Sequence, residues 1–246
     1  MFEKKTKQFA RDVDLLKFSF EGIIYNPLDY AWNSHEYFLK NYIKPSADVM
    51  FLGMNPGPFG MVQNGIPFGE SDHVRHYLNI AIPVGKPEIE HTHRPVLGLE
   101  NRRNEVSGKR FWSLMESHYP SPDDFALRMA VFNYCPLAFL DSGSRARNIT
   151  PDKLKKEERT ALFDICDKYI FEIIEELKPQ YLIGVGQFAK KKFEKLVEGK
   201  DIFVGSILHP SPGSPQANNG WAEKTTEKLI EYGIWGSNDR KKNLSF

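Results

Sequence analysis

Three polar side chains, Asn55, Asn133 and His209, stand at the ends of apolar runs and shortly before a proline. Proline fixes φ and restricts the backbone of the residue before it, so the turns that carry these side chains are stiff. Two carboxamides and an imidazole held in place offer hydrogen bonds to a ligand or to water. The pattern predicts a preorganised polar pocket, with the aromatic Phe68 as a fourth candidate.

Several common kinds of catalytic site are missing from the sequence. It contains no G-x-S-x-G elbow, no Walker loop and no complete G-x-G-x-x-G, since "GVGQF" at 184–188 lacks the third glycine. No pair of carboxylates follows the apolar runs, which disfavours hydrolysis by two acidic residues. Histidines as close as those of "HTH" at 91–93, with Asp72, His73 and His76, are more often solvated than metal-bound. We expect neither a metal nor a cofactor.

The apolar runs predict the elements that must position these residues. Four runs rich in Val, Ile, Leu or Phe, at 47–54, 126–135, 181–186 and 202–209, have the composition of strands buried on both faces. Helical patterns separate them, at 27–43, 71–81, 107–119, about 150–177, 187–198 and 218–233. We therefore predict an α/β fold: a single domain over residues 1–246 with a central four-stranded parallel sheet flanked by helices. In such sheets ligands bind where the carboxyl ends of the strands meet.

Composition and charge narrow the class of protein. The 246 residues are 41% hydrophobic and 26% charged, as in soluble globular proteins, and the formal net charge of +1 argues against wholesale electrostatic binding of nucleic acid or membrane. Two cysteines cannot build a four-ligand metal site and favour a reducing, intracellular setting. The sequence shows neither a signal peptide nor an apolar run that could span a bilayer. We expect residues 1–8 and 237–246 to be flexible.

One segment, residues 50–70, combines glycine and proline to an unusual degree and carries "GMNPGPFGM" and then "GIPFGE". Together with "HPSPGSPQANNGW" near the carboxyl end, these motifs resemble those of the single-strand-selective monofunctional uracil-DNA glycosylases, a branch of the uracil-DNA glycosylase superfamily. "RPVLGLE", "EVSGKRFW", "NYCPL" and "LIGVG" extend the resemblance over residues 20 to 235. Motifs of this length and order, placed at predicted strand ends, are specific.

The resemblance implies an enzyme that hydrolyses the N-glycosidic bond of uracil in DNA and leaves an abasic site, as in base excision repair. Such an enzyme must flip the nucleotide out of the duplex. Phe68 resembles the residue that stacks on the base and Asn133 the one that reads its edge. Asn55 resembles the residue that orients the attacking water, and His209 the donor to uracil O2. Each also has a plain structural interpretation: a core phenylalanine, a turn cap or a loop histidine.

Further positions follow from the same resemblance. Gly57 and Met61 match positions near uracil C5, and a glycine there leaves room for polar C5 groups such as hydroxymethyl. Gly53 and Met54 belong to the same motif and are expected to contact the base. Because the motifs place neither a lysine nor a terminal amine as a nucleophile, we expect no lyase step.

The expected partner is single- and double-stranded DNA that contains uracil or modified uracil. A wedge that enters the duplex is expected at Pro210, Ser211, Pro212, Gly213, Ser214, Pro215 and Gln216. Animal members of the family have an arginine and an asparagine where this chain has Gly213 and Ser214, which puts its efficiency on duplex DNA in doubt. Phosphates are expected to meet Lys190 and Lys191, with Lys192, Arg102, Arg103, Arg145 and Arg147 as further candidates, although a solvated face is the more usual role of such charges.

Two alternatives remain open at this stage. A glycosylase that prefers deaminated purines, xanthine or hypoxanthine, would need only small changes around Asn133 and Met61. A non-catalytic relative that binds damaged DNA would have lost the polar residues at the strand ends, whereas Asn55 and His209 are present. We expect a monomer that does not bind membranes and that works in the nucleoid of a bacterium or the nucleus of a eukaryote.

Overall fold

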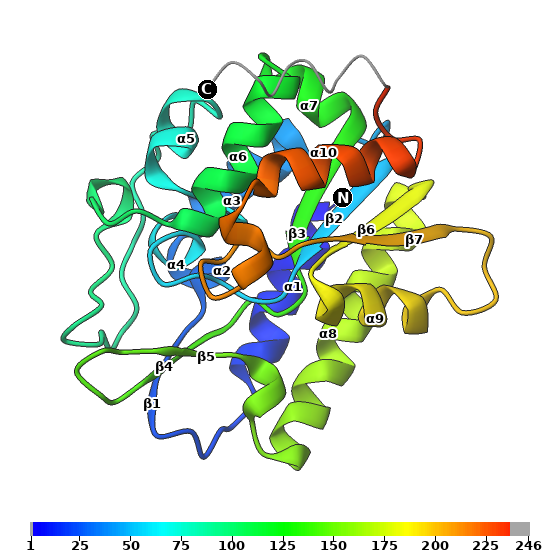
Figure 1. The fold of residues 1–246 in the computed structure, drawn as a ribbon. Helices are drawn as coiled ribbons and strands as arrows, with labels where there is room; N and C mark the ends of the chain where they lie inside the picture. Colours follow the sequence, from blue (N-terminus) through cyan, green and yellow to red (C-terminus); the bar gives the residue numbers. More distant parts are fainter. Residues whose placement is uncertain (1, 237–246) are drawn as a thin grey trace.

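The computed structural model describes residues 2–236 and is built around a parallel sheet. Strands β2 (Val49–Gly53), β3 (Met129–Asn133), β6 (Tyr181–Val185) and β7 (Phe203–Ile207) pair in the order β3-β2-β6-β7 (Figure 1). Every residue of β2 and β3 is buried, as their unbroken apolar sequences predict. The predicted α/β class and the four-stranded parallel sheet are confirmed.

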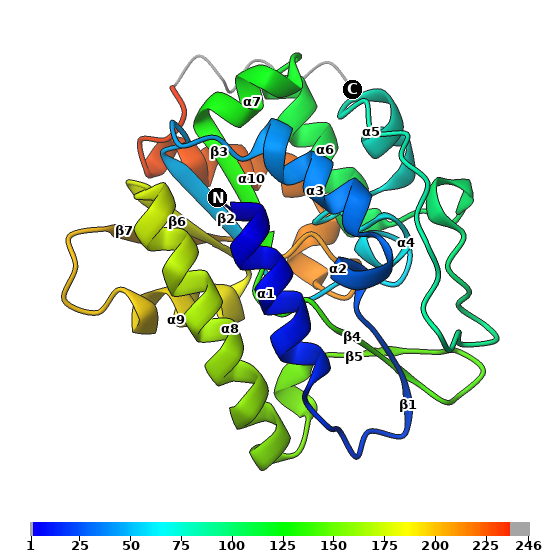
Figure 2. The ribbon, with the colours of Figure 1, turned by 180° about the vertical axis from the view of Figure 1, so that it is seen from behind.

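Helices cover both faces of this sheet. Helices α1 (Phe2–Asp14), α3 (Trp32–Tyr42) and α8 (Lys156–Leu177) lie on the face seen in Figure 2. Helices α6 (Val106–His118) and α10 (Trp221–Glu231) lie on the face seen in Figure 1, and α9 (Gln187–Leu196) packs against β6 and β7. The shorter helices are α2 (Pro27–Tyr30), α4 (Met61–Asn64), α5 (Ser71–His76) and α7 (Pro122–Arg128), with 3₁₀ turns η1 (Gly98–Glu100), η2 (Pro151–Lys153) and η3 (Pro215–Asn218).

A second, smaller sheet was not predicted from the sequence. Strands β1 (Gly22–Tyr25), β4 (Ala138–Asp141) and β5 (Asn148–Ile149) pair antiparallel in the order β1-β4-β5 (Figure 1). These strands are two to four residues long, which is too short for a periodicity to show. Strand β4 follows β3 after a short loop, and β5, which pairs with β4, lies next to the loop that follows β2.

Residues 2–8, which we expected to be flexible, form the first turns of a helix. Helix α1 begins at Phe2, and its buried residues recur with helical spacing. It is held against α8 by Phe9, which stacks on Tyr169 with ring centroids 4.0 Å apart, and by a 2.7 Å hydrogen bond between the hydroxyls of Thr6 and Tyr169. The expected flexible segment 237–246 lies outside the described residues.

Three predicted element boundaries also change. The run at 126–135 begins as the end of α7, whose start is marked by Ser121 capping the N–H of Asp123 and by Pro122. The helix predicted at 71–81 ends at His76, and Asn79 beyond it adopts a left-handed backbone with φ of 51°, which is incompatible with a helix that continues to residue 81. The helix predicted from Thr150 is interrupted after η2, and α8 begins at Lys156.

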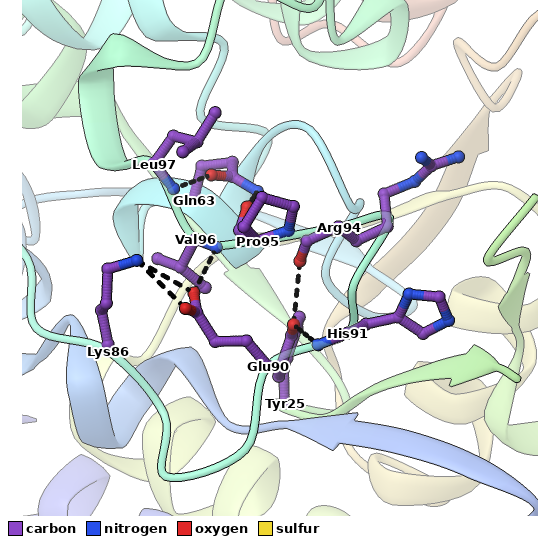
Figure 3. A network of polar contacts seen from close by, with 9 residues as sticks. All are labelled: Tyr25, Gln63, Lys86, Glu90, His91, Arg94, Pro95, Val96 and Leu97. Carbon is purple, nitrogen blue, oxygen red and sulfur yellow. Dashed lines mark hydrogen bonds and ion pairs between the residues drawn. The ribbon is translucent and has the colours of Figure 1, made fainter. Parts of the chain in front are cut away.

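A long connection between α5 and α6 is fixed by polar contacts rather than by regular structure (Figure 3). The hydroxyl of Tyr25, on β1, donates to the carbonyl of Arg94 at 2.8 Å and accepts from the N–H of His91 at 2.6 Å (Figure 3). Gln63, on α4, donates to the carbonyl of Pro95 at 3.3 Å and accepts from the N–H of Leu97 at 2.7 Å. The connection is thereby tied to β1 and to α4.

Both cysteines, Cys135 after β3 and Cys166 on α8, are buried thiols. Burial raises the pKa of Cys166, with Cys135 beside it as a further cause. Within residues 2–236, none of the helices combines the length and the apolar composition needed to cross a membrane.

His35 supplies a prediction about stability. It is buried on α3, where its Nδ1–H donates to the carbonyl of Gly65 at 2.7 Å, and burial lowers its pKa to about 4. Because an unfolded histidine titrates near ~6.5, the unfolded state binds the extra proton as the pH falls below that value. We predict that His35 costs the folded state about 2 kcal/mol between pH 7 and pH 5.

Urea unfolding of the wild type and of His35→Gln at these two pH values measures this effect. The variant should lose that part of the pH dependence, whereas His76→Gln, at an exposed site, should keep it. An unchanged pH dependence in His35→Gln would contradict the assignment.

Candidate active site

A cavity of about 540 Å³ opens at the carboxyl edge of the parallel sheet. The loops that follow β2, β3, β6 and β7 all contribute to it, because parallel strands end at one edge. Most of the predicted site residues line this cavity: Met54, Asn55, Gly57, Met61, Phe68, Asn133, His209, Ser211, Gly213 and Ser214. The structure therefore brings together residues that lie up to 160 positions apart in the sequence.

Gly53 lies beneath this group rather than in the lining. Its partner across the sheet is Asn133, and a Cβ atom at position 53 would lie 2.3 Å from Asn133 Oδ1 and 2.9 Å from Cζ of Phe68. Real Cβ atoms do not approach other atoms so closely. A glycine is required here so that two side chains of the cavity can pack against the backbone.

Phe68 is held in an unusual backbone conformation, with φ of 55°. Its ring stacks on Phe111 of α6, with centroids 4.8 Å apart and planes 17° apart. A Cβ atom at Gly108, also on α6, would lie only 2.1 Å from the carbonyl oxygen of Phe68. Left-handed backbone costs a residue other than glycine on the order of 1 kcal/mol or more, so the packing of α6 must hold Phe68 in place. The result is a fixed flat apolar surface.

Asn133 and Asn55 present carboxamides from neighbouring loops. Asn133 is 9% exposed, and its Nδ2 lies 3.1 Å from Sδ of Met61. Asn55 Nδ2 lies 3.4 Å from both the carbonyl of Leu137 and Oδ1 of Asn148, and Asn148 in turn donates to the carbonyl of Pro56 at 2.8 Å. Among the described residues, the hydrogen bonds of Asn55 engage its Nδ2, so Oδ1 is the atom that can accept one from a ligand or water.

His209 follows β7 and adds an imidazole. The N–H of Ser211 donates to its Nδ1 at 3.2 Å, which places the proton of the neutral ring on Nε2. Burial lowers the pKa of His209, so the neutral form is favoured. The arrangement supplies a neutral N–H donor to the cavity beside two carboxamides.

Sequence reasoning missed several lining residues, of which Glu105 matters most. It precedes α6 rather than following a strand, so the pattern of polar residues at strand ends does not include it. Its carboxyl group lies against the backbone of Gly57 and Gly60, and burial raises its pKa. Ser107, Asn148, Thr150, Gln187 and Phe188 were also missed and line the same cavity.

The predicted wedge forms the rim of the cavity. Pro210 is buried, and Pro212, Pro215 and Gln216 are exposed outside the lining. Arg110 of α6 donates to the carbonyl of Pro210 at 2.8 Å, and Trp221 of α10 donates to the carbonyl of Leu208 at 2.8 Å. Pro215 begins the 3₁₀ turn η3. The start of the rim is thus anchored to α6 and α10.

The basic residues proposed for phosphate binding differ in their surroundings. Lys190 and Lys191 lie on α9 outside the cavity lining, where Lys190 pairs with Glu194 at 3.3 Å and Lys191 is exposed. Lys192 is engaged within the protein: its side chain is 13% exposed, and its Nζ pairs with Asp167 at 3.0 Å and lies over the rings of Tyr134 and Phe163.

Three of the other arginine and histidine candidates have partners within the protein. Arg147 pairs with Asp141 at 2.8 Å, and Arg103 lies 5.2 Å from the ring centroid of Phe59. His91 donates from Nε2 to the carbonyl of Asp141 at 2.9 Å and accepts at Nδ1 from the N–H of His93. Residues 2–236 contain no cluster of three or more side chains arranged to hold a metal ion.

Comparisons with known proteins agree on one family. Residues 40–231 match the model of the uracil DNA glycosylase superfamily. Single-strand selective monofunctional uracil DNA glycosylases of Mus musculus and Rattus norvegicus are each 43% identical over 215 residues, which is 87% of this chain and 76% and 77% of those proteins. The Bos taurus protein of that name is 42% identical over 87% of this chain and 78% of its own length. The resemblance seen in the motifs is confirmed.

A solved structure shares the fold. Wild-type SMUG2 of Pedobacter heparinus matches with a TM-score of 0.65 over 95% of this chain and 99% of its own, at 18% identity. At 18% identity this match shows a shared fold and nothing about function.

The state of His209 can be measured directly. We predict a neutral ring with its proton on Nε2 at pH 6.5, because burial lowers its pKa from 6.5 and Nδ1 accepts from Ser211. Long-range ¹H–¹⁵N NMR reports both tautomer and charge. The same residue in urea-unfolded protein should titrate near ~6.5 and serves as the control. A proton on Nδ1, or a charged ring at pH 6.5 in the folded protein, would contradict the geometry.

Proposed function

Because this chain belongs to the uracil-DNA glycosylase superfamily, we propose that it hydrolyses the N-glycosidic bond of uracil in DNA and leaves an abasic site. One observation carries the proposal: Phe68, Asn133, Asn55 and His209 meet in a single cavity at the carboxyl edge of the sheet. That cavity offers a flat apolar surface, two carboxamides and a neutral donor, which together suit a neutral planar ring. A base that is stacked inside a duplex cannot enter such a cavity, so the nucleotide must be flipped out of the helix.

Asn133 would distinguish uracil from cytosine. Uracil presents an N3–H donor beside the O4 acceptor, whereas cytosine presents an acceptor beside an amino donor. A carboxamide held in one orientation matches the first pattern and opposes the second. Each buried polar group left unpaired costs about 1–3 kcal/mol. The fixed position of Asn133 between Gly53 and Met61 supports this role.

His209 and Asn55 would act on the bond itself. As the bond between C1′ and N1 breaks, its electron pair leaves with uracil and the sugar becomes cationic. Nε2–H of His209 would donate to O2 as negative charge develops there, a contribution worth about 3–4 kcal/mol for comparable donors in other enzymes. Oδ1 of Asn55 would orient the water that adds to C1′ and then loses its proton. Such a water needs orientation more than deprotonation, so a carboxamide suffices.

The C5 edge of the base would face Gly57 and Met61, which line the cavity beside Asn133. We propose that this edge accepts uracil with small polar C5 groups such as hydroxymethyl. The described lining of the cavity contains no lysine, which supports hydrolysis without a lyase step.

The rim would meet the DNA. Segment 210–216 stands beside the cavity and ends in the exposed η3 turn, so it is placed to fill the gap that a flipped base leaves. Lys190 and Lys191, at the start of α9, are the proposed phosphate contacts. We propose that the protein acts as a monomer on both single- and double-stranded DNA.

The first test is release of uracil from a single-stranded oligonucleotide in the presence of EDTA. We predict release, because every proposed role belongs to a side chain of the protein. Asn55→Ala and His209→Ala should each reduce the single-turnover rate at least about a hundredfold, as removal of a comparable donor does elsewhere. Binding to abasic DNA should remain.

Asn41→Ala, on α3 away from the cavity, is the matched control and should keep the wild-type rate. Near-normal turnover in Asn55→Ala or His209→Ala would show that the roles are wrongly assigned. Release of xanthine or hypoxanthine without any uracil would replace the proposal by the purine alternative.

Gly213 provides a test of the rim. A Cβ atom at this position would meet only Ser211 Oγ, at an ordinary 3.5 Å, so a side chain fits. We predict that Gly213→Arg raises activity on duplex DNA relative to single strands several-fold, because a duplex carries a higher density of phosphate charge than a single strand and an added cation is attracted to it more strongly. Gly213→Gln, of similar size without the charge, is the control. An equal effect of both variants would assign the change to shape rather than charge.

A further inference from the structure

The rim, segment 210–216, has few hydrogen bonds of its own with which to hold its shape. Residues 210, 212 and 215 are prolines, which have no N–H to donate. Within these seven residues, all of them described, one backbone hydrogen bond forms, from the N–H of Ser214 to the carbonyl of Ser211 at 2.9 Å. The shape of the rim therefore depends on donors that lie outside it.

A single guanidinium group joins the two ends of this segment. Nη1 of Arg110, on α6, donates to the carbonyl of Pro210 at 2.8 Å, and Nη2 donates to Oδ1 of Asn218 at 3.2 Å. Asn218, at the end of η3, in turn donates from Nδ2 to the carbonyl of Pro212 at 3.0 Å. Arg110 and Asn218 thus form a brace that connects the start, the middle and the far end of the rim.

Arginine suits the first position of this brace. Its guanidinium is a planar fork of five N–H donors that can serve two acceptors at once, whereas the ammonium of lysine is a point donor on a flexible stem. Both acceptors of Arg110 are uncharged oxygens, and none of the ion pairs among residues 2–236 involves it. Its contacts are therefore directional hydrogen bonds to the rim.

Packing leaves a gap behind the rim. A second cavity, of about 570 Å³, lies between α6, η3 and α10, and both members of the brace line it together with Ala217 and Trp221. Side chains that border a void have no atoms to contact on that side. The hydrogen bonds of Arg110 span this gap, so they set how far the rim stands from α6.

We propose that Arg110 is a positioning residue that holds the rim in shape for duplex DNA, an inference that rests on the proposed function. To replace a flipped nucleotide, the rim must enter a stacked duplex, and a loose segment would first have to lose its conformational freedom. A single strand has no opposite strand and no paired gap to fill, so excision from it depends little on the brace. Arg110 lies outside the lining of the active-site cavity and acts through the rim.

The test compares release of uracil from a duplex and from a single-stranded oligonucleotide by the wild type and by Arg110→Gln. We expect the ratio of single-turnover rates, duplex over single strand, to fall about tenfold or more, with the single-strand rate within about threefold of wild type. Thermal melting verifies that the variant is folded. An equal loss on both substrates would overturn the inference, because Arg110 would then act on bond cleavage through the neighbouring His209.

Two further variants separate the brace from the charge. Lys109→Gln removes a cation from the adjacent, exposed position of α6 and should keep the wild-type ratio. Asn218→Ala breaks the brace without changing any charge and should lower the ratio as Arg110→Gln does. Equal ratios in Lys109→Gln and Arg110→Gln, or a wild-type ratio in Asn218→Ala, would overturn the inference.

Combining and conserving the changes tests whether the two residues act as one unit. The double variant of Arg110→Gln and Asn218→Ala should lose no more than the larger single effect, because both residues belong to one network. Arg110→Lys keeps the charge but not the fork, so its ratio should stay several-fold below that of the wild type. Additive losses, or full recovery with lysine, would contradict the brace.

Hydrogen exchange of the free protein, followed by NMR, tests the brace without turnover. The amides of Ser214 and Ala217 donate within the rim, to the carbonyls of Ser211 and Ser214, and should exchange about tenfold faster in Arg110→Gln. The amide of Tyr134, which donates to Gly53, is the internal control and should not change. Unchanged exchange in the rim would overturn the inference even if uracil is released. Faster exchange in the variant, with no uracil release by the wild type, would overturn the proposed function alone.

Discussion

The pairing of Gly53 with Asn133 across β2 and β3 is the contact on which the rest of the cavity depends. Beyond the last paired residues, the N–H groups of Tyr134 and Cys135 donate to the carbonyls of Gly53 and Met54 at 2.9 and 2.8 Å, so the ladder extends into the loops. Asn55 follows at once and starts from a fixed backbone. Because a Cβ at Gly53 would strike both Asn133 and the ring of Phe68, any larger residue must displace two walls of the cavity together.

The chemistry of the cavity rests on neutral groups held in single orientations. Burial keeps His209 neutral, and Ser211 selects its tautomer. Asn55 and Asn133 carry no charge in any state, and their amides are turned by Leu137, Asn148 and Met61. Groups oriented before a ligand arrives cost no reorganisation during a reaction, which suits the stabilisation of charge that appears only as a bond breaks. Glu105 is the one carboxyl group in the described lining of the cavity, and burial raises its pKa.

The parts of the fold that the sequence predicts well are those with a strong local signal. The four strands read as unbroken apolar runs, and prolines after their ends identified Asn55, Asn133 and His209. The antiparallel sheet was not predicted, because strands of two to four residues are too short to show a periodicity. One of them, β5, nevertheless supplies Asn148 to the cavity. Glu105 was not predicted because it precedes a helix and does not follow a strand. The ion pair of Lys192 with Asp167 was not predicted either, because a lysine in a run of basic residues gives no sign of its partner. Helix α1 could have been predicted from the sequence, because its buried residues recur at helical spacing: Phe2, Thr6, Phe9 and Val13.

Helix α6 joins parts of the cavity that are separate in the sequence. Glu105 precedes its first turn, Gly108 and Phe111 hold Phe68 within it, and Arg110 reaches the rim at Pro210. Residues 105–111 span about two turns of helix. Because one short stretch of α6 and the residue before it make all of these contacts, a shift of this helix would displace the rim, the stacking ring and the acidic side chain together.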